Sequence, residues 1–206
     1  MLPLALPLVA NLPTVFKIAQ VAMKIVSYIQ VAAQVIGAVA NKLGVLQDGQ
    51  RAEDFGYAMR NAKKSAEEFS TINEYFAYLN DEIKAGNIDM SGKREMIDIV
   101  AGNALVAQAI CGKLGLETSP EFWDMLCKKA QQERLDSNEA ASILEICSKT
   151  NVSLQDITSY INNTELSGEV SASDVSSTIE SALQEAHPER SQTDIADRFN
   201  DLLKKD

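Results

Sequence analysis

The residues that could carry out nucleophilic or metal chemistry are few in this 206-residue chain. It has one histidine, His187, which directly precedes Pro188. A Ser–His or Cys–His pair would have to be built on this residue alone. A histidine in this position is typical of a helix end, where it bonds the terminal carbonyl groups. Zinc sites with several histidine ligands and paired Glu-x-x-His metal sites lack the residues they need. We therefore expect no catalytic centre at His187.

The three cysteines, Cys111, Cys127 and Cys147, are odd in number and far apart. Each lies among apolar residues with helical spacing, where a small hydrophobic side chain would serve equally well. This pattern favours a reducing compartment, and we expect a cytoplasmic protein. Residues 2–10 are apolar, but they lack a basic flank and contain two prolines, which argues against a secretory signal peptide.

Carboxylates are abundant, but their arrangement does not indicate catalysis. They occur as adjacent pairs, such as Glu53–Asp54 and Glu67–Glu68, which are typical of solvated helix faces. We expect a protein that is not an enzyme and has no cofactor.

One loop carries oxygen-bearing side chains at alternating positions. These are Asn163, Glu165, Ser167, Glu169 and Asp174, with Gly168 where a sharp turn would fall. The loop resembles that of an EF-hand, and this resemblance implies a calcium site. The helical outline of residues 120–186 also resembles small tellurite-resistance-type domains. The loop departs from the EF-hand pattern because the closing residue is the short Asp174, so an inert turn between two helices is the competing interpretation.

The distribution of charge excludes nucleic acid as a partner. The net charge is −10, and residues 1–50 contribute about +2 because they hold three lysines against Asp48. The rest of the chain would repel a phosphate backbone. Residues 137–161 have the outline of a helix-turn-helix, but the segment 153–161 that would read DNA contains no basic residue.

The strongest pattern is an apolar seam in the first quarter of the chain. Its members recur at alternating steps of four and three: Ile18, Ala22, Ile25, Ile29, Ala32, Ile36, Val39, Leu43 and Leu46. This spacing predicts one long amphipathic helix over residues 13–46. Its flanks lack the charges of a two-stranded coiled coil, so we expect either several helical neighbours or a membrane surface.

The remainder of the chain predicts capped helices and no strands. Residues 47–85 read as a linker and a helical hairpin, with helices over 52–69 and 71–85 and a capping box at Thr71 and Glu74. Residues 86–206 read as an acidic domain of three helix-pair units. The units form an irregular repeat, or they share common capping boxes by chance. A helix over 93–114 is rich in small residues, and we expect it at the centre of an all-α bundle.

Three functional hypotheses follow. In the first, the chain is a non-catalytic assembly protein whose N-terminal helix docks another copy or another helical protein, since an exposed seam would form an apolar patch that soluble monomers seldom tolerate. In the second, residues 1–46 lie on a bilayer, as in a peripheral or secreted effector without a cleavable signal. In the third, the acidic units form a metal-binding regulator or an enzyme.

Overall fold

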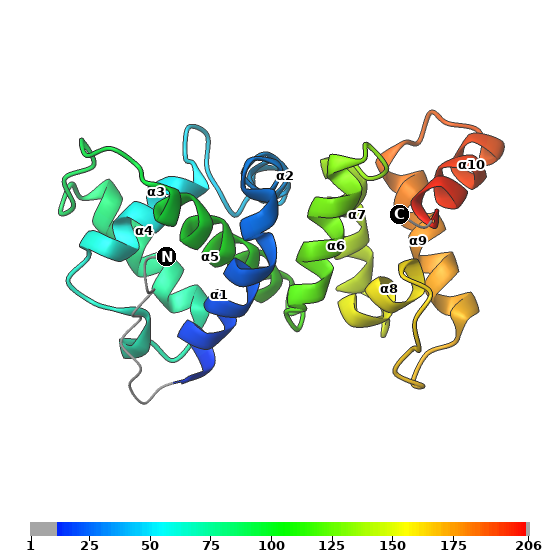
Figure 1. The fold of residues 1–206 in the computed structure, drawn as a ribbon, viewed down its shortest axis with the longest axis horizontal. Helices are drawn as coiled ribbons and strands as arrows, with labels where there is room; N and C mark the ends of the chain where they lie inside the picture. The colour runs from blue at the N-terminus through cyan, green and yellow to red at the C-terminus, as the bar shows by residue number, and fades with distance from the viewer. Residues whose placement is uncertain (1–11, 205–206) are drawn as a thin grey trace.

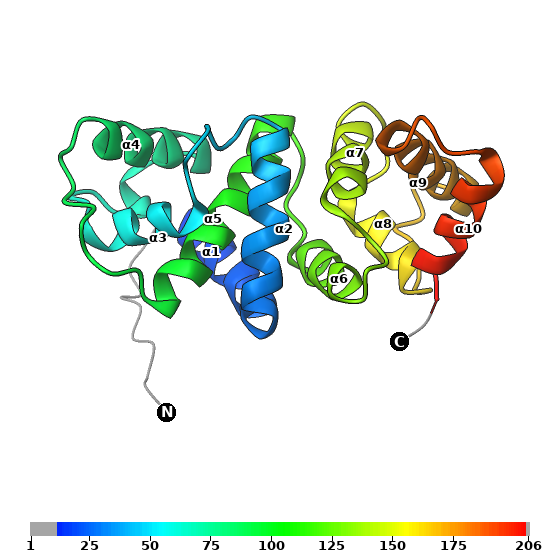
Figure 2. The ribbon, with the colours of Figure 1, turned by 90° about the horizontal axis from the view of Figure 1, so that it is seen from above.

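The computed structural model describes the backbone of residues 12–204 and the side chains of residues 17–204. The predicted all-α class is confirmed, because no strand occurs in these residues. The helices lie in two groups along the longest axis, with α1–α5 on one side and α6–α10 on the other (Figures 1 and 2). Their bounds are α1 Leu12–Ile25, α2 Ile29–Lys42, α3 Ala52–Asn61, α4 Ile72–Lys84, α5 Met96–Leu114, α6 Pro120–Gln131, α7 Ser137–Cys147, α8 Leu154–Ile161, α9 Ala172–Ala186 and α10 Gln192–Leu202.

The long N-terminal helical segment is confirmed, with one difference in its shape. Val26–Tyr28 form a 3₁₀ turn between α1 and α2, and Tyr28 leaves the helical region at φ −120° and ψ 29°. Consequently α1 and α2 run in different directions, and α2 is seen nearly end-on in Figure 1. The bend lets both segments pack against α5 and α6. The segment ends at Lys42 rather than at residue 46, followed by Gly44 in the left-handed region at φ 63°. Residues 2–10 lie outside the described part of the chain.

Helix α5 is the central helix of the first group, as its small residues predict. It packs against α1, α2, α3 and α4 and is apolar on nearly all sides. At the crossing with α3, Gly56 and Gly102 bring the two backbones into direct contact, because a Cβ atom on either would lie 1.9 Å from a carbonyl oxygen of the other helix. The sequence grouped α5 with the acidic C-terminal residues, whereas its helix contacts are mainly with α1–α4.

The second predicted helix is shorter than expected. It covers residues 52–69 in the sequence prediction, but α3 ends at Asn61, and Ala62 is extended at φ −72° and ψ 153°. A separate 3₁₀ turn, Ala66–Glu68, follows with its own capping box. The interruption lets Phe69 pack against the rings of Tyr75 and Tyr78, at centroid distances of 5.3 and 5.0 Å.

Side-chain caps begin all five helices of the second group. Ser153 and Ser191 each accept a hydrogen bond from the backbone amide three residues later, and Asp136 and Ser171 cap α7 and α9 in the same way. The Thr71–Glu74 capping box of α4 is also present. The apolar residue of each predicted turn is buried: Ile88, Leu135 and Val170. These turns therefore anchor the helix pairs to the core.

The two groups share one core. The buried apolar side chains form a continuous cluster that extends from α1 to α10. The groups meet where α1 and α2 pack against α6, and where α2 and α5 pack against α7. Helix α2 therefore lies at the junction between the two groups (Figure 2).

Candidate functional sites

Most of the predicted interaction seam is part of the protein's own core. Seven of its nine residues are buried within the chain: Ile18, Ile25, Ala32, Ile36, Val39, Leu43 and Leu46. The remaining two, Ala22 and Ile29, are half-buried. The periodicity correctly identified the buried face of this segment. That face is not a surface in this structure, so it does not by itself require a partner.

The opposite side of α1 and α2 is exposed and carries little charge. We call the residues Met23, Val26, Gln30, Gln34, Ala38 and Asn41 the outer face. Met23 is 68% and Val26 50% exposed, which is unusual for large apolar side chains. No charged residue occurs between Lys24 and Lys42. The outer face is therefore an exposed helical surface of apolar, amide and small side chains.

Two described helices are long and apolar enough to cross a membrane, by length and composition alone. These are Lys17–Lys42, which includes the 3₁₀ turn, and α5. In the most apolar stretch of α5, 67% of the residues are buried. In the most apolar stretch of Lys17–Lys42, only 22% are buried. Burial accounts for the composition of α5 as a core helix. It does not account for that of α1 and α2.

The loop that resembles an EF-hand does not gather its acidic side chains. Gly168 makes the expected sharp turn at φ 85°, but Asn163, Glu165, Ser167 and Glu169 are all exposed. The Asp174 carboxylate accepts hydrogen bonds from the Ser171 amide and hydroxyl, at 3.0 and 2.7 Å, so it caps its own helix. This position fits the inert-turn interpretation, because both bonds go to Oδ2, and a residue that closes a calcium loop needs both of its carboxylate oxygens.

A cluster of charged side chains that the sequence did not reveal lies at the start of α7. Glu139 is fully buried and is held by Arg198 of α10 through two parallel bonds, Nε–Oε1 at 2.7 Å and Nη2–Oε2 at 2.8 Å. The hydrogen bond to Glu139 raises the pKa of Arg198 above its usual value, which keeps the guanidinium charged. A buried carboxylate without such a partner would be strongly destabilising. This pair therefore ties α10 to α7.

His187 belongs to the same cluster, which corrects its predicted role. Its Nε2 atom lies 3.3 Å from Asp136 Oδ2 and 3.3 Å from Glu139 Oε1, so the ring faces carboxylates and does not bond the terminal carbonyls of α9. The side chain is only 12% exposed. Asp136, Glu139 and His187 are the one group of acidic, histidine or cysteine side chains in the described residues whose spacing suits a metal ion.

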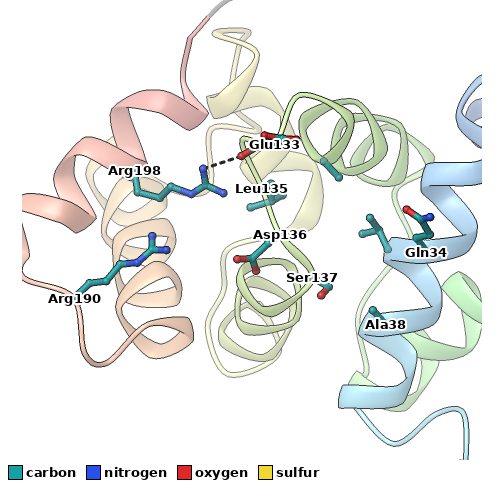
Figure 3. Close-up of a pocket in the computed structure, with 10 residues that line it drawn as sticks. Gln34, Ala38, Glu133, Leu135, Asp136, Ser137, Arg190 and Arg198 are labelled. Carbon is teal, nitrogen blue, oxygen red and sulfur yellow. Dashed lines mark hydrogen bonds between the residues drawn. The ribbon is translucent and has the colours of Figure 1, made fainter.

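A pocket of about 530 Å³ adjoins this cluster. Gln34 and Ala38 of α2 lie on one side of it, and Asp136, Arg190 and Arg198 lie on the other (Figure 3). Arg198 also donates a hydrogen bond to the Glu133 carbonyl at 3.0 Å, which fixes the guanidinium at the pocket wall. The pocket thus connects the outer face of α2 with the charged cluster.

The cysteines are unsuited to nucleophilic chemistry. All three are buried, and burial raises the pKa of the Cys111 thiol to about 11 and those of Cys127 and Cys147 to about 12. A thiol of this kind stays protonated near neutral pH, whereas a catalytic cysteine needs the thiolate.

The sequence contained two signals of the charged cluster. One was Asp136-x-x-Glu139, which reads as a capping box, and the other was the single histidine at a helix end. Neither signal indicated that residues 136, 139, 187 and 198 would meet. Comparisons of the chain with protein-family models, with curated proteins and with solved structures find no match.

Proposed function

We propose that the protein is a non-catalytic helical assembly protein that pairs with a second copy of itself through the outer face. The observation that carries the proposal is the absence of charged residues between Lys24 and Lys42, although Gln30, Gln34, Ala38 and Asn41 are exposed. An exposed helix face in a soluble protein ordinarily carries charged side chains. A face without them is suited to contact with another protein.

The side chains of the outer face favour a second copy as the partner. The amides of Gln30, Gln34 and Asn41 each contain donors and an acceptor, so they can pair with their own kind across a two-fold axis. A Cβ atom on Gly37, beside them, would meet nothing within 4 Å, so a neighbouring helix has room to approach. The chain carries a net charge of −10, and an uncharged face avoids direct repulsion between two acidic molecules.

Light scattering after size-exclusion chromatography tests this proposal. The full chain is expected to be a dimer, and Gln30→Glu with Gln34→Glu is expected to make it a monomer by placing four carboxylates in the interface. The matched control is Ser177→Glu with Ser181→Glu, which adds the same charges at the same spacing on the exposed face of α9 and should leave the dimer intact. A full chain that is monomeric at every concentration would contradict the proposal.

A second candidate function is attachment to an anionic membrane surface. The observation in its favour is that Met23 and Val26 are exposed next to Lys24, in the one part of the chain with a positive balance of charge. Met23→Gln with Val26→Gln should then abolish sedimentation with vesicles that contain phosphatidylserine. Substitution of Ile25 or Ile36 would not test this hypothesis, because both are core residues. Equal sedimentation of the variant and the parent would exclude it.

Location in the cytoplasm stays a prediction. The three cysteines are all free, as expected for a reducing compartment.

A further inference from the structure

Asp136 and Glu139 each have one carboxylate oxygen that lies next to Nε2 of His187. Asp136 Oδ1 accepts the backbone amides of Asn138 and Glu139, at 2.7 and 2.9 Å, while Oδ2 faces His187. Glu139 Oε2 accepts the Asp136 amide and one bond from Arg198. Glu139 Oε1 accepts a single bond from Arg198, and a carboxylate oxygen can accept two. The remaining acceptor site of Oε1 is therefore available beside His187.

The histidine presents an unsatisfied atom to these two oxygens. Nε2 of His187 is buried and has no hydrogen-bond partner, although both oxygens lie 3.3 Å away. A buried polar atom without a partner is costly and calls for an explanation. One proton on Nε2 points in one direction and cannot bond both oxygens well. A cation placed between the three atoms would satisfy all of them.

Two of the three separations between these atoms match those of metal ligands. Zinc binds histidine nitrogen and carboxylate oxygen at about 2.0–2.2 Å, so two ligands in a tetrahedral site lie about 3.3–3.6 Å apart. Both separations from Nε2 are 3.3 Å, and the three ligand atoms all lie within 4.8 Å of one another. The side chains therefore need little movement to coordinate an ion.

The surroundings supply further features of a metal site. The Glu189 carboxylate lies 3.6 Å from Nδ1 of His187, on the side where a metal-bound histidine commonly faces a carboxylate. Arg198 fixes the orientation of Glu139, and its positive charge reduces the attraction for a cation. Asp136 and Arg198 line the pocket of Figure 3, which leaves space for water as a further ligand.

We propose that Asp136 Oδ2, Glu139 Oε1 and His187 Nε2 form a binding site for a divalent transition-metal ion of the zinc class. The mixed nitrogen and oxygen ligands favour such an ion over calcium or magnesium, which prefer oxygen alone. The ion would join α7 to the end of α9, next to the bond between α7 and α10.

Isothermal titration calorimetry with Zn²⁺ and the visible absorption of bound Co²⁺ test the site on the full chain. We expect one ion per chain, and a loss of affinity of at least about tenfold in His187→Gln. Asp136→Asn is a second variant, because asparagine still caps α7 but removes the ligand charge. It should lose affinity while keeping the thermal stability of the metal-free protein.

The matched control is Glu165→Gln with Glu169→Gln, which removes two exposed carboxylates from the loop before α9 and should leave zinc binding unchanged. Calcium should not displace Co²⁺. The proposal fails if the parent protein binds no Zn²⁺, or if both His187→Gln and Asp136→Asn bind it as tightly as the parent.

Discussion

The close backbone crossing of α3 and α5 provides a sharp prediction for Gly102→Ala. A Cβ atom on Gly102 would lie 1.9 Å from the Ala52 carbonyl oxygen and 2.9 Å from the Gly56 nitrogen. A carbon atom normally approaches a carbonyl oxygen to about 3.3 Å, so α3 and α5 would have to separate by roughly 1.4 Å. Both obstructing atoms belong to the backbone, and no change of rotamer can relieve the clash.

The expected cost follows from what this separation disrupts. Overfilling a packed interior costs about 1–3 kcal/mol, and replacing a helical glycine by alanine returns at most about 1 kcal/mol. The separation also strains the bond between Arg60 on α3 and the buried Asp98 on α5, whose Nη2 and Oδ2 atoms are 2.7 Å apart. We therefore expect a net loss of about 2 kcal/mol, or about 4–8 °C in Tm for a chain of this size.

Urea denaturation followed by circular dichroism measures this loss, and Gly37→Ala is the matched control. Gly37 is also a helical glycine, but a Cβ atom there would meet nothing within 4 Å. Gly37→Ala should therefore stabilise the monomer by about 0.5–1 kcal/mol, measured at a concentration at which the protein is monomeric. The two substitutions are chemically identical, but they should change the free energy of unfolding in opposite directions. If the Gly102→Ala variant were as stable as the Gly37→Ala variant, the two helices α3 and α5 could not cross as closely as described.

Three further predictions concern other parts of the chain. Because burial raises the thiol pKa values, Cys111, Cys127 and Cys147 should resist a thiol reagent near neutral pH in the native protein, and all should react in denaturant. Glu133 is held in the left-handed region at φ 60°, so Glu133→Gly should raise stability by about 0.5–1 kcal/mol in thermal unfolding. Burial acts to raise the pKa of the Asp156 carboxyl, but hydrogen bonds from Ser153 and Ser167 outweigh it and hold this pKa below its usual range. The stabilisation by Asp156 is present above the unfolded pKa and lost as pH falls through the folded pKa. Asp156→Asn should therefore destabilise the protein less at a pH below the folded pKa than near pH 7.

The sequence predicts best the features that depend on neighbouring residues. The caps at Ser153 and Ser191 could be identified because each serine bonds an amide only three residues away. The buried face of α1 and α2 could be identified because the seam follows the helical period. Such features require no knowledge of what lies elsewhere in the fold.

The differences between prediction and structure depend on distant residues. The turn at Val26–Tyr28 has no proline or glycine to mark it, and it directs α1 and α2 onto α5 and α6. The meeting of Glu139 with Arg198 joins residues 59 positions apart. No local pattern could have specified either arrangement.

The exposed face of α2, opposite the apolar seam, is the better candidate for an interaction surface. An apolar seam has the same spacing whether its own chain or a partner covers it, so the period alone cannot separate core from interface. The residues on the opposite face of the helix distinguish a core helix from an interface helix. A helix whose only contacts are with its own core ordinarily carries charged residues on its solvent-exposed face. Helix α5 has few charges because it is buried on nearly all sides, whereas α2 has none between its bend and Lys42 although its outer face is exposed. The missing charge on that outer face therefore argues for a binding surface more strongly than the seam does.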